Sequence, residues 1–284
     1  MSFITLKIFA LLTMLADHIG LFIPNTPIFL RWIGRLAAPI FTFCSVLAYS
    51  YTSNKKFYLL RLYIAGLVMS IIQCFIFIEN NYFRTLFSIC VLLSLLESYK
   101  NKDRNFKKLL IAYIIWQVFS ISINILFLNA LFISEEFDAY FLSALFGNIF
   151  CLEGGIIFTF LGVLFYLTKD NRKLLIIGYI VFCMFYFIAT ATNLISVVLG
   201  KFYHLGFTLL PDMLEYILDT IIGINPMDVG GSLIYKDFQW MMIAALPFLL
   251  IYNGKQGKKL KYIFYIFYPV HIIILFYIGS LIGK

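Results

Sequence analysis

The chain has 284 residues, of which 62% are apolar, 19% are aromatic and only 13% are charged. Such a chain cannot present a polar surface to water on all sides, which excludes an ordinary water-soluble protein and indicates the lipid bilayer as the main solvent. The excess of 22 Lys and Arg over 14 Asp and Glu does not indicate a nucleic-acid partner, because the basic residues lie in short clusters between long apolar segments, as membrane orientation requires.

About nine apolar segments follow one another, and most are long enough for the roughly 20 helical residues that cross the hydrocarbon core. They lie at 3–23, 28–51, 57–78, 83–99, 108–132, 139–168, 173–199, 237–252 and 261–282. The sixth is long for one helix and has Gly154 and Gly155 at its middle, so it is either one span or two half-helices around a buried site, with a tenth, re-entrant piece. We therefore predict an all-α, polytopic transmembrane bundle of about nine to ten spans.

The segment 200–236 separates the seventh and eighth spans. Its sequence "PDMLEYILDTIIG" sets an apolar face opposite the acidic residues Asp212, Glu215 and Asp219. The apolar face consists of Met213, Leu214, Ile217, Leu218, Ile221 and Ile222. This pattern predicts an outer interfacial helix or a lid, attached to a single transmembrane domain that occupies residues 1–284.

The charges in the loops alternate in sign along the chain. The basic loops carry Lys55, Lys56 and Arg61, then Lys100, Lys102, Arg104, Lys107 and Lys108, then Lys169, Arg172 and Lys173, then Lys255, Lys258, Lys259 and Lys261. The loops between them carry Glu79, then Glu135, Glu136 and Asp138, then Asp212, Glu215, Asp219, Asp228 and Asp237. Because basic loops stay on the cytoplasmic side, we expect a cytoplasmic N-terminus and an external C-terminus.

Cysteine usage and the common motifs exclude several kinds of site. All five cysteines lie in apolar segments without CxxC spacing, so neither a disulfide framework nor a thiolate metal site is indicated. They are Cys44, Cys74, Cys90, Cys151 and Cys183. The sequence has no G-x-S-x-G, HExxH, P-loop or GxGxxG motif, and we predict no metal.

The first two spans contain ionisable residues, which are costly in a bilayer and usually face a cavity or one another. In "LTMLADHIG", Asp17 and His18 are adjacent, and His18 follows Lys7 by eleven residues, which places Lys7 and His18 on almost the same helical face. Arg31 and Arg35 are four residues apart and therefore stack on one face of the second span. We expect Asp17 to face one of these two arginines.

Later spans add further ionisable groups. The sequence "FYPVHI" places His271 near the membrane centre with Tyr268 one turn before it, and Glu153 lies near the middle of the sixth span. The ionisable residues of the spans also have purely structural explanations. Lys7 would be a snorkelling residue, Arg31 an interface anchor, and a histidine a hydrogen-bond partner between helices. Structural pairing alone, however, needs only one acid for each cation. Two histidines, two arginines, an aspartate and a glutamate in one bundle therefore favour a catalytic or transport site that contains His18 and Arg35.

These residues carry a resemblance to a known family. "LKIFALLTMLADHIG", "LRWIGRLAAPIFTF" and "NKKFYLLRL" resemble the opening of the TraX family of membrane acetyltransferases, the F-pilin acetylase type. "LPFLLIYNGKQGKKLKYIFYIFYPVHI" is similar to the closing helices of that family. In the middle, "NYFRTL" and "LEGGIIFTFLGVLFYL" are weaker matches, since Arg84 and Glu153-Gly154-Gly155 stand where the family has an apolar residue and Asp-Tyr-Gly.

The resemblance implies a member of the multi-span membrane acyltransferases in the bacterial cytoplasmic membrane. Such an enzyme moves an acetyl group from cytosolic acetyl-CoA to an amine or hydroxyl on the outer side, on a pilin-like protein, a peptide, a glycan or a lipid head group. In this interpretation Lys7, Lys55, Lys56 and Lys255 bind the polyanionic coenzyme.

The remaining candidates then take roles in acyl transfer. His18 is the general base, Arg35 stabilises the oxyanion, and Asp17 holds an arginine in place. His271 is a second proton-transfer group, and the acceptor is bound by Arg31, Tyr268 and Glu153. Two alternatives remain: a proton-coupled transporter or flippase that uses the same buried charges, and a non-catalytic scaffold.

Overall fold

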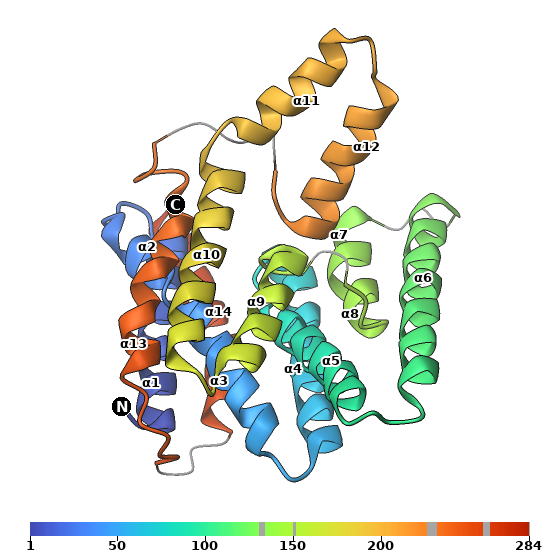
Figure 1. Cartoon of the computed structure of the whole chain (residues 1–284). Coiled ribbons are helices and arrows are strands. Elements are labelled where there is room, and N and C mark those ends of the chain that lie inside the picture. The colour runs from blue at the N-terminus through green and yellow to red at the C-terminus, as the bar shows by residue number, and fades with distance from the viewer. Residues whose placement is uncertain (131–133, 150–151, 226–231, 258–261, 284) are drawn as a thin grey trace. The chain divides into compact units, whose positions relative to one another are not determined.

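The computed structural model describes residues 1–130, 134–149, 152–225, 232–257 and 262–283. Within these ranges every regular element is a helix, and no strand occurs. Cys151, Asp228, Lys258, Lys259 and Lys261, which the sequence analysis named, lie outside the described residues. The all-α prediction is therefore confirmed for the part of the chain that is described (Figure 1).

Seven helices in the described ranges are long and apolar enough to cross a membrane, as judged by length and composition. They are α1 (Phe3–Phe22), α2 (Phe29–Gly34) together with α3 (Ala37–Tyr51), α4 (Lys55–Ile76), α5 (Tyr82–Lys100), α6 (Phe106–Ala130), α10 (Arg172–Ala191) and α14 (Ile263–Ile282). Many large apolar side chains on them are exposed, as lipid-facing residues would be. The chain is thus a multi-pass membrane protein by its helices.

Three further apolar helices have only 10 to 17 residues each. They are α9 (Gly155–Thr168), α11 (Leu194–His204) and the continuous stretch formed by the 3₁₀-helix η3 (Phe238–Ala245) and α13 (Leu246–Leu250). A helix shorter than about 17 residues does not cross the full hydrocarbon core unaided. The count of nine to ten spans therefore stays a prediction.

The segment 139–168 is broken, which was one of the two expected forms: its first helical part ends at Leu145 and its second begins at Gly155. Its first part is the π-helix η1 (Asp138–Leu142), preceded by α7 (Glu135–Phe137) and followed by α8 (Ser143–Leu145). The second part, α9, begins only at Gly155. Gly154 and Gly155 have φ angles of 77° and 67°, and a Cβ atom on Gly155 would lie 2.0 Å from the carbonyl oxygen of Ile222, so only glycine fits there.

The prediction of one continuous span at 173–199 is wrong. Helix α10 ends at Ala191, Thr192 is extended with φ −116° and ψ 153°, and α11 begins at Leu194. The Thr192 hydroxyl donates to the carbonyl oxygen of Ile188 at 2.5 Å, and the amide of Leu194 donates to that hydroxyl at 3.4 Å. A threonine side chain that bonds the backbone in this way competes with the helical ladder, which explains the break.

The segment predicted as an interfacial helix is helical, as α12 (Leu209–Ile217) and the π-helix η2 (Leu218–Ile222). Helix α12 packs beside α11 (Figure 1). Met213 on its apolar face is 54% exposed. On the polar side, the Tyr203 hydroxyl of α11 donates a hydrogen bond to the Asp212 carboxylate of α12. The location of this hairpin at the membrane surface stays a prediction.

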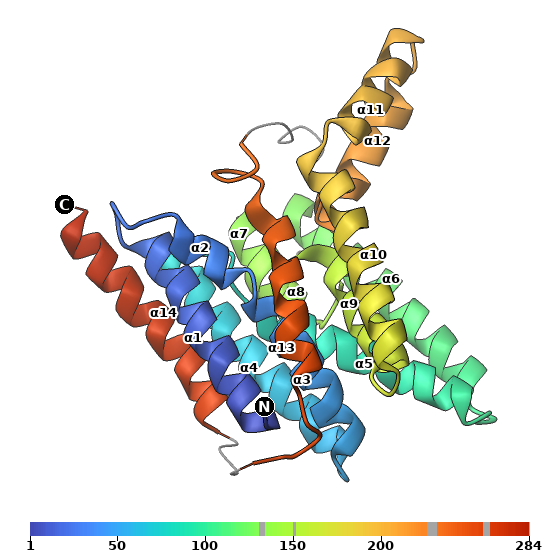
Figure 2. The same cartoon turned by 60° about the vertical axis from the view of Figure 1, so that its left-hand side comes forward.

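The described chain divides into two compact units. The first comprises Met1–Cys44, Leu167–Asp219 and Ile224–Lys284, and the second comprises Ser45–Tyr166 and Thr220–Gly223. In the first unit α1 packs against α2 on one side and α14 on the other, as Figure 2 shows. In the second unit α4 packs against α5, η1 and α8, and α6 packs against α5, η1 and α8.

Two glycines let the helices of the first unit approach one another closely. A Cβ atom on Gly34 of α2 would lie 2.2 Å from the Cβ atom of Asp17, and one on Gly279 of α14 would lie 2.1 Å from the carbonyl oxygen of Phe22. Small residues at crossings are the usual means of close helix packing in membranes. Gly34 and Gly279 thereby bring α2 and α14 against α1 at the part of α1 that carries Asp17 and His18.

Candidate functional site

The centre of the candidate site is a pair of buried histidines on α1 and α14. His18 is 3% exposed and His271 is 5% exposed. Nδ1 of His18 lies 2.6 Å from Nε2 of His271, and Nδ1 of His271 lies 2.7 Å from the carbonyl oxygen of Phe267. The rings are stacked, with centroids 4.9 Å apart. We call these two residues the histidine pair.

The hydrogen bonds assign the tautomers of the neutral histidine pair. A carbonyl oxygen only accepts, so Nδ1 of His271 carries the proton and donates it to Phe267. Nε2 of His271 is then the acceptor, and Nδ1–H of His18 donates to it. The remaining nitrogen, Nε2 of His18, is unprotonated, and no other described residue hydrogen-bonds to it. The two histidines therefore offer one unshared electron pair, on Nε2 of His18.

Aromatic rings surround the histidine pair. The Tyr268 ring lies 6.1 Å from the His18 ring and 5.8 Å from the His271 ring, and the Phe22 ring lies 6.0 Å from His18. The Phe267 ring stacks on His271 at 4.8 Å. These rings pack around both imidazoles. Tyr268, which the sequence placed one turn before His271, contacts the rings of both histidines.

The second part of the site is an arginine pair that shares one carboxylate. Oδ1 of Asp17 accepts from Nη2 of Arg35 at 2.5 Å and lies 3.2 Å from Nη1 of Arg31. Nη1 of Arg31 also donates to the backbone carbonyl of Asp17 at 3.2 Å. The side chain of Asp17 is 12% exposed and those of the two arginines are each 19% exposed. The expectation that Asp17 faces an arginine is confirmed, and it faces both.

The start of η3 completes this arginine cluster, which we define as Asp17, Arg31, Arg35 and Gln239. Nη1 of Arg35 donates to Oε1 of Gln239 at 2.7 Å, and Nε of Arg35 donates to the carbonyl oxygen of Arg31 at 3.3 Å. The ring of Phe238 lies 5.2 Å from Cζ of Arg35 and 5.9 Å from Cζ of Arg31. Arg35 is thus held on every side, whereas Arg31 has N–H groups to spare.

Lys7 lies further along the same face of α1. Its ammonium is 4.4 Å from the centroid of the Phe264 ring on α14, which precedes His271 by seven residues, or about two turns. Lys7 and His18 therefore both face α14, and the prediction that they share one face of α1 is confirmed. Lys255 is exposed, and its carbonyl oxygen accepts from the amide of Phe3 at 2.8 Å, which joins the 252–257 turn to the start of α1.

Three other predicted site residues belong to the second unit. Lys55 lies 2.5 Å from the Glu97 carboxylate and 5.0 Å from the Tyr49 ring, so its charge already has a partner. Lys56 is exposed. Glu153 lies in the turn before α9, where its backbone carbonyl accepts from the Thr85 hydroxyl at 2.8 Å. The residues that the structure brings together are His18, His271, Tyr268, Asp17, Arg31 and Arg35.

The polar interior of the second unit was not predicted from the sequence. Asn124 of α6 donates to the hydroxyl of Ser143 at 2.7 Å, and Asn148 donates to Oδ1 of Asn124 at 3.4 Å. Gln117, Ser120 and Asn124 recur at helical spacing on one buried face of α6, and this signal was present in the sequence. Gln239 was also missed, because nothing local marks it as a partner of an arginine on another helix.

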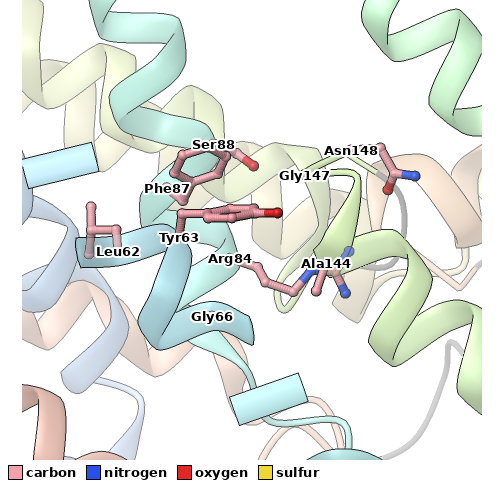
Figure 3. A pocket seen from close by; sticks show the side chains of 9 residues that line it. All are labelled: Leu62, Tyr63, Gly66, Arg84, Phe87, Ser88, Ala144, Gly147 and Asn148. Carbon is pink, nitrogen blue, oxygen red and sulfur yellow. The ribbon is translucent and has the colours of Figure 1, made fainter. Parts of the chain in front are cut away.

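A small pocket lies beside this network in the second unit (Figure 3). Arg84 reaches into it from α5, is 6% exposed, and donates to the carbonyl oxygen of Ala139 at 3.0 Å. Its lining residues are Leu62, Tyr63, Gly66, Arg84, Phe87, Ser88, Ala144, Gly147 and Asn148. Across the described ranges, no group of three or more His, Cys, Asp or Glu side chains is arranged to hold a metal ion.

The fold and the site define a multi-pass, all-helical membrane protein with titratable and charged groups gathered inside its first unit. The chain belongs to the TraX family, since the family model described as "TraX protein" matches residues 2–136 and 122–279. The resemblance noted in the sequence is thus confirmed at the level of the family. No curated protein and no solved structure matches the chain.

Proposed function

We propose that this TraX-family protein is a membrane acetyltransferase that moves an acetyl group from cytosolic acetyl-CoA to an amine or hydroxyl acceptor on the outer side of the cytoplasmic membrane. The observation that carries the proposal is the histidine pair, which presents an unshared nitrogen on His18. An unprotonated imidazole is the usual general base at neutral pH. Membership of the TraX family and the basic inner loops support the same assignment.

In the proposed reaction, Nε2 of His18 takes the proton of the acceptor N–H or O–H while the acceptor atom attacks the thioester carbonyl carbon. The tetrahedral intermediate carries a negative oxygen. When it collapses, the C–S bond breaks, the acetyl group stays on the acceptor, and the departing thiolate of coenzyme A takes the proton from His18. Atoms and charge balance without an additional reactant.

His271 acts as a positioning residue in this scheme. Its own Nδ1–H is committed to Phe267, so its Nε2 accepts only from His18 and keeps the lone pair of His18 on Nε2. When His18 becomes an imidazolium, the 2.6 Å hydrogen bond to His271 becomes charge-assisted and stronger. Tyr268 sits against both rings and takes part in acceptor binding.

The arginine cluster supplies the positive charge that the oxyanion needs. Arg31 and Arg35 both contact Asp17, the residue next to His18 in the chain, so their charges can act on an intermediate formed beside His18. Asp17 and Gln239 fix the guanidinium of Arg35, which makes the charge pre-organised. Lys7 and Lys255, near the inner end of α1 in the proposed orientation, attract coenzyme A phosphates.

The experiment is transfer of labelled acetyl groups from acetyl-CoA by the purified, detergent-solubilised protein, followed as release of free coenzyme A. We expect His18→Gln to lower transfer about 100-fold or more, as is typical for loss of a general base. His204→Gln on the exposed end of α11 is the matched control, and it should leave transfer unchanged. Folded wild-type protein that neither binds nor consumes acetyl-CoA would contradict the proposal and favour a proton-coupled transporter built on the same charges.

A further inference from the structure

We infer that the acceptor carries an oxyanion, a phosphate or a carboxylate, close to the amine or hydroxyl that is acetylated, and that Arg31 binds this oxyanion. The inference rests on the proposed function and identifies the class of its acceptor. Three features of the first unit carry it: the unbalanced charge of the arginine cluster, the N–H groups that Arg31 leaves unused, and the position of Arg31 relative to Lys7.

The charge of the arginine cluster is not balanced from within. Two guanidiniums share the one carboxylate of Asp17, and Gln239 is neutral, so the cluster has a net charge of +1. In the described ranges neither arginine forms an ion pair with a second carboxylate. Cationic side chains inside a membrane protein are costly and normally pair with an anion or face a cavity. An anion from outside the chain would complete the set.

Arg31 has the donors for such an anion. Only its Nη1 bonds within the described structure, to the carboxylate and backbone oxygens of Asp17. Nε and Nη2 form no hydrogen bond with any described residue, and neither is among the buried, unpaired polar atoms. A guanidinium edge with two parallel N–H groups matches a phosphate or carboxylate in bidentate geometry. Arg35, in contrast, donates hydrogen bonds to Asp17, Gln239 and the backbone carbonyl of Arg31.

The position of Arg31 separates this anion from those of coenzyme A. The Cδ and Cγ atoms of Arg31 lie beside Gly20, since a Cβ atom there would be 3.0 Å from each. Lys7 is on the opposite side of His18 along α1, about 16 Å from it at 1.5 Å per residue. In the proposed orientation, coenzyme A reaches His18 from the Lys7 end, and its phosphates remain there. The anion at Arg31 therefore belongs to the acceptor.

The test is a binding measurement that does not depend on acetyl transfer. Thermal unfolding of the purified full chain in detergent is followed with glucosamine 6-phosphate and, as its matched partner without the phosphate, glucosamine. We expect the phosphate compound to raise the melting temperature and glucosamine to have no effect. Arg31→Gln should weaken binding of the phosphate compound about tenfold to 100-fold, the usual value of a lost charge-assisted pair. Equal stabilisation by both compounds would overturn the inference.

Two control variants separate geometry from bulk charge. Arg31→Lys keeps the charge but loses the planar edge, so its affinity should fall between those of the wild type and Arg31→Gln. Lys201→Gln removes one exposed cation of the same unit and should bind like the wild type. If Lys201→Gln weakened binding as much as Arg31→Gln, the effect would be general electrostatics and the inference would be wrong.

Coenzyme A provides the arm that distinguishes this inference from the proposed function. Arg31→Gln should bind coenzyme A as the wild type does. Weaker binding of coenzyme A by Arg31→Gln would place its phosphates at the arginine cluster and overturn the inference, while the acetyltransferase proposal would stand. Conversely, if phosphate binding depends on Arg31 but the protein never consumes acetyl-CoA, the anion site would be supported and the acetyltransferase proposal would be wrong.

The source of the oxyanion is resolved by the choice of acceptor. In nanodiscs that contain phosphatidylethanolamine, labelled acetyl groups recovered in the lipid fraction, and lost in Arg31→Gln, would identify a head-group phosphate. Label on glucosamine 6-phosphate in phosphatidylcholine nanodiscs would identify a water-soluble acceptor. Transfer to glucosamine at the same rate as to its 6-phosphate would contradict an oxyanion requirement of either kind.

Discussion

The two units of this chain both bury polar groups, but they bury different kinds. In the first unit the interior holds the titratable histidine pair and the arginine cluster with its net positive charge. In the second unit the buried network is mostly amides and hydroxyls, such as Asn124, Ser143 and Asn148, which bond to one another. Neutral groups of this kind hold helices together in a membrane without any change of charge.

The difference supports the location of the proposed reaction in the first unit. The proposed acyl transfer needs a group that takes up a proton and donors or positive charge for the oxyanion, and the first unit brings a histidine pair and two arginines together. The second unit also buries a cation, Arg84, but it contains no histidine. The ion pair of the second unit, Lys55 with Glu97, lies at its periphery and is about one-third exposed, 33% and 30%. We therefore expect variants in the first unit to change both activity and stability, and variants in the second to change stability alone.

Asp17→Asn should have the largest effect, because it leaves two guanidiniums without their carboxylate. Removal of one partner of a buried ion pair typically costs about 3–5 kcal/mol. We expect a large drop in the melting temperature in detergent and loss of acetyl transfer. Glu97→Gln in the second unit is the matched control, and because Lys55 and Glu97 are partly solvated it should cost less than about 1 kcal/mol. Equal losses in the two variants would erase the contrast between the units.

Gly34→Ala should act next most strongly, through the packing that positions Asp17. The added Cβ atom would lie 2.2 Å from the Cβ atom of Asp17, so α2 must move away from α1. Such overpacking costs about 1–3 kcal/mol and would displace the arginines from the histidine pair, which should lower transfer as well. In Gly200→Ala on α11, by comparison, the new Cβ atom meets nothing within 4 Å, and transfer should be unchanged. Full activity in Gly34→Ala would show that the close contact is unimportant.

Asn124→Leu tests the second unit directly. The change removes the hydrogen bonds that Asn124 makes with Ser143 and Asn148, and a hydrogen bond between membrane helices is worth about 1 kcal/mol. We expect a modest drop in melting temperature with acetyl transfer per folded molecule unchanged. A selective loss of transfer, at wild-type stability, would mean that the second unit takes part in the reaction.

The sequence predicted the helical faces that carry the candidate site, because those signals are local. Two spacings fix helical faces: eleven residues between Lys7 and His18, and four between Arg31 and Arg35. The negative charge of Asp17 within a span also requires a cationic partner. Contacts between distant segments could not be predicted in this way. The hydrogen bond between Arg35 and Gln239 joins residues 204 positions apart. The direction of the hydrogen bond within the histidine pair depends on the backbone carbonyl of Phe267, which has no sequence signature.

Predicted helix boundaries were wrong where a single side chain ends a helix within an apolar segment. Thr192 ends α10 through its hydroxyl, although the segment around it is apolar enough to continue. Gly154 and Gly155 marked the other break correctly, since glycine has no Cβ atom and tolerates the positive φ angles found there. The amides on α6 recur at helical spacing in the sequence, but neutral polar residues within a span do not by themselves indicate a site.

The smallest effect is expected at the α11–α12 hairpin, outside both buried networks. The hydrogen bond that Tyr203 donates to the Asp212 carboxylate raises the pKa of Tyr203 to about 12. Because the protonated phenol is the form that the fold favours, this contribution is present below the ordinary tyrosine pKa of about 10 and is lost as the pH rises from there toward 12.

Absorbance at 295 nm of the wild type minus that of Tyr203→Phe isolates this one phenol among 19 tyrosines. Its midpoint should lie near pH 12, and in an Asp212→Asn background it should fall toward about 10, the ordinary value for tyrosine. Acetyl transfer at neutral pH should be the same in Tyr203→Phe as in the wild type, since the phenol is fully protonated there and lies on neither buried network. A midpoint near 10 in the wild type would show that the hairpin is not held by this bond. Reduced transfer in Tyr203→Phe would instead make the hairpin a working part of the acceptor side, as the lid that the sequence also allowed.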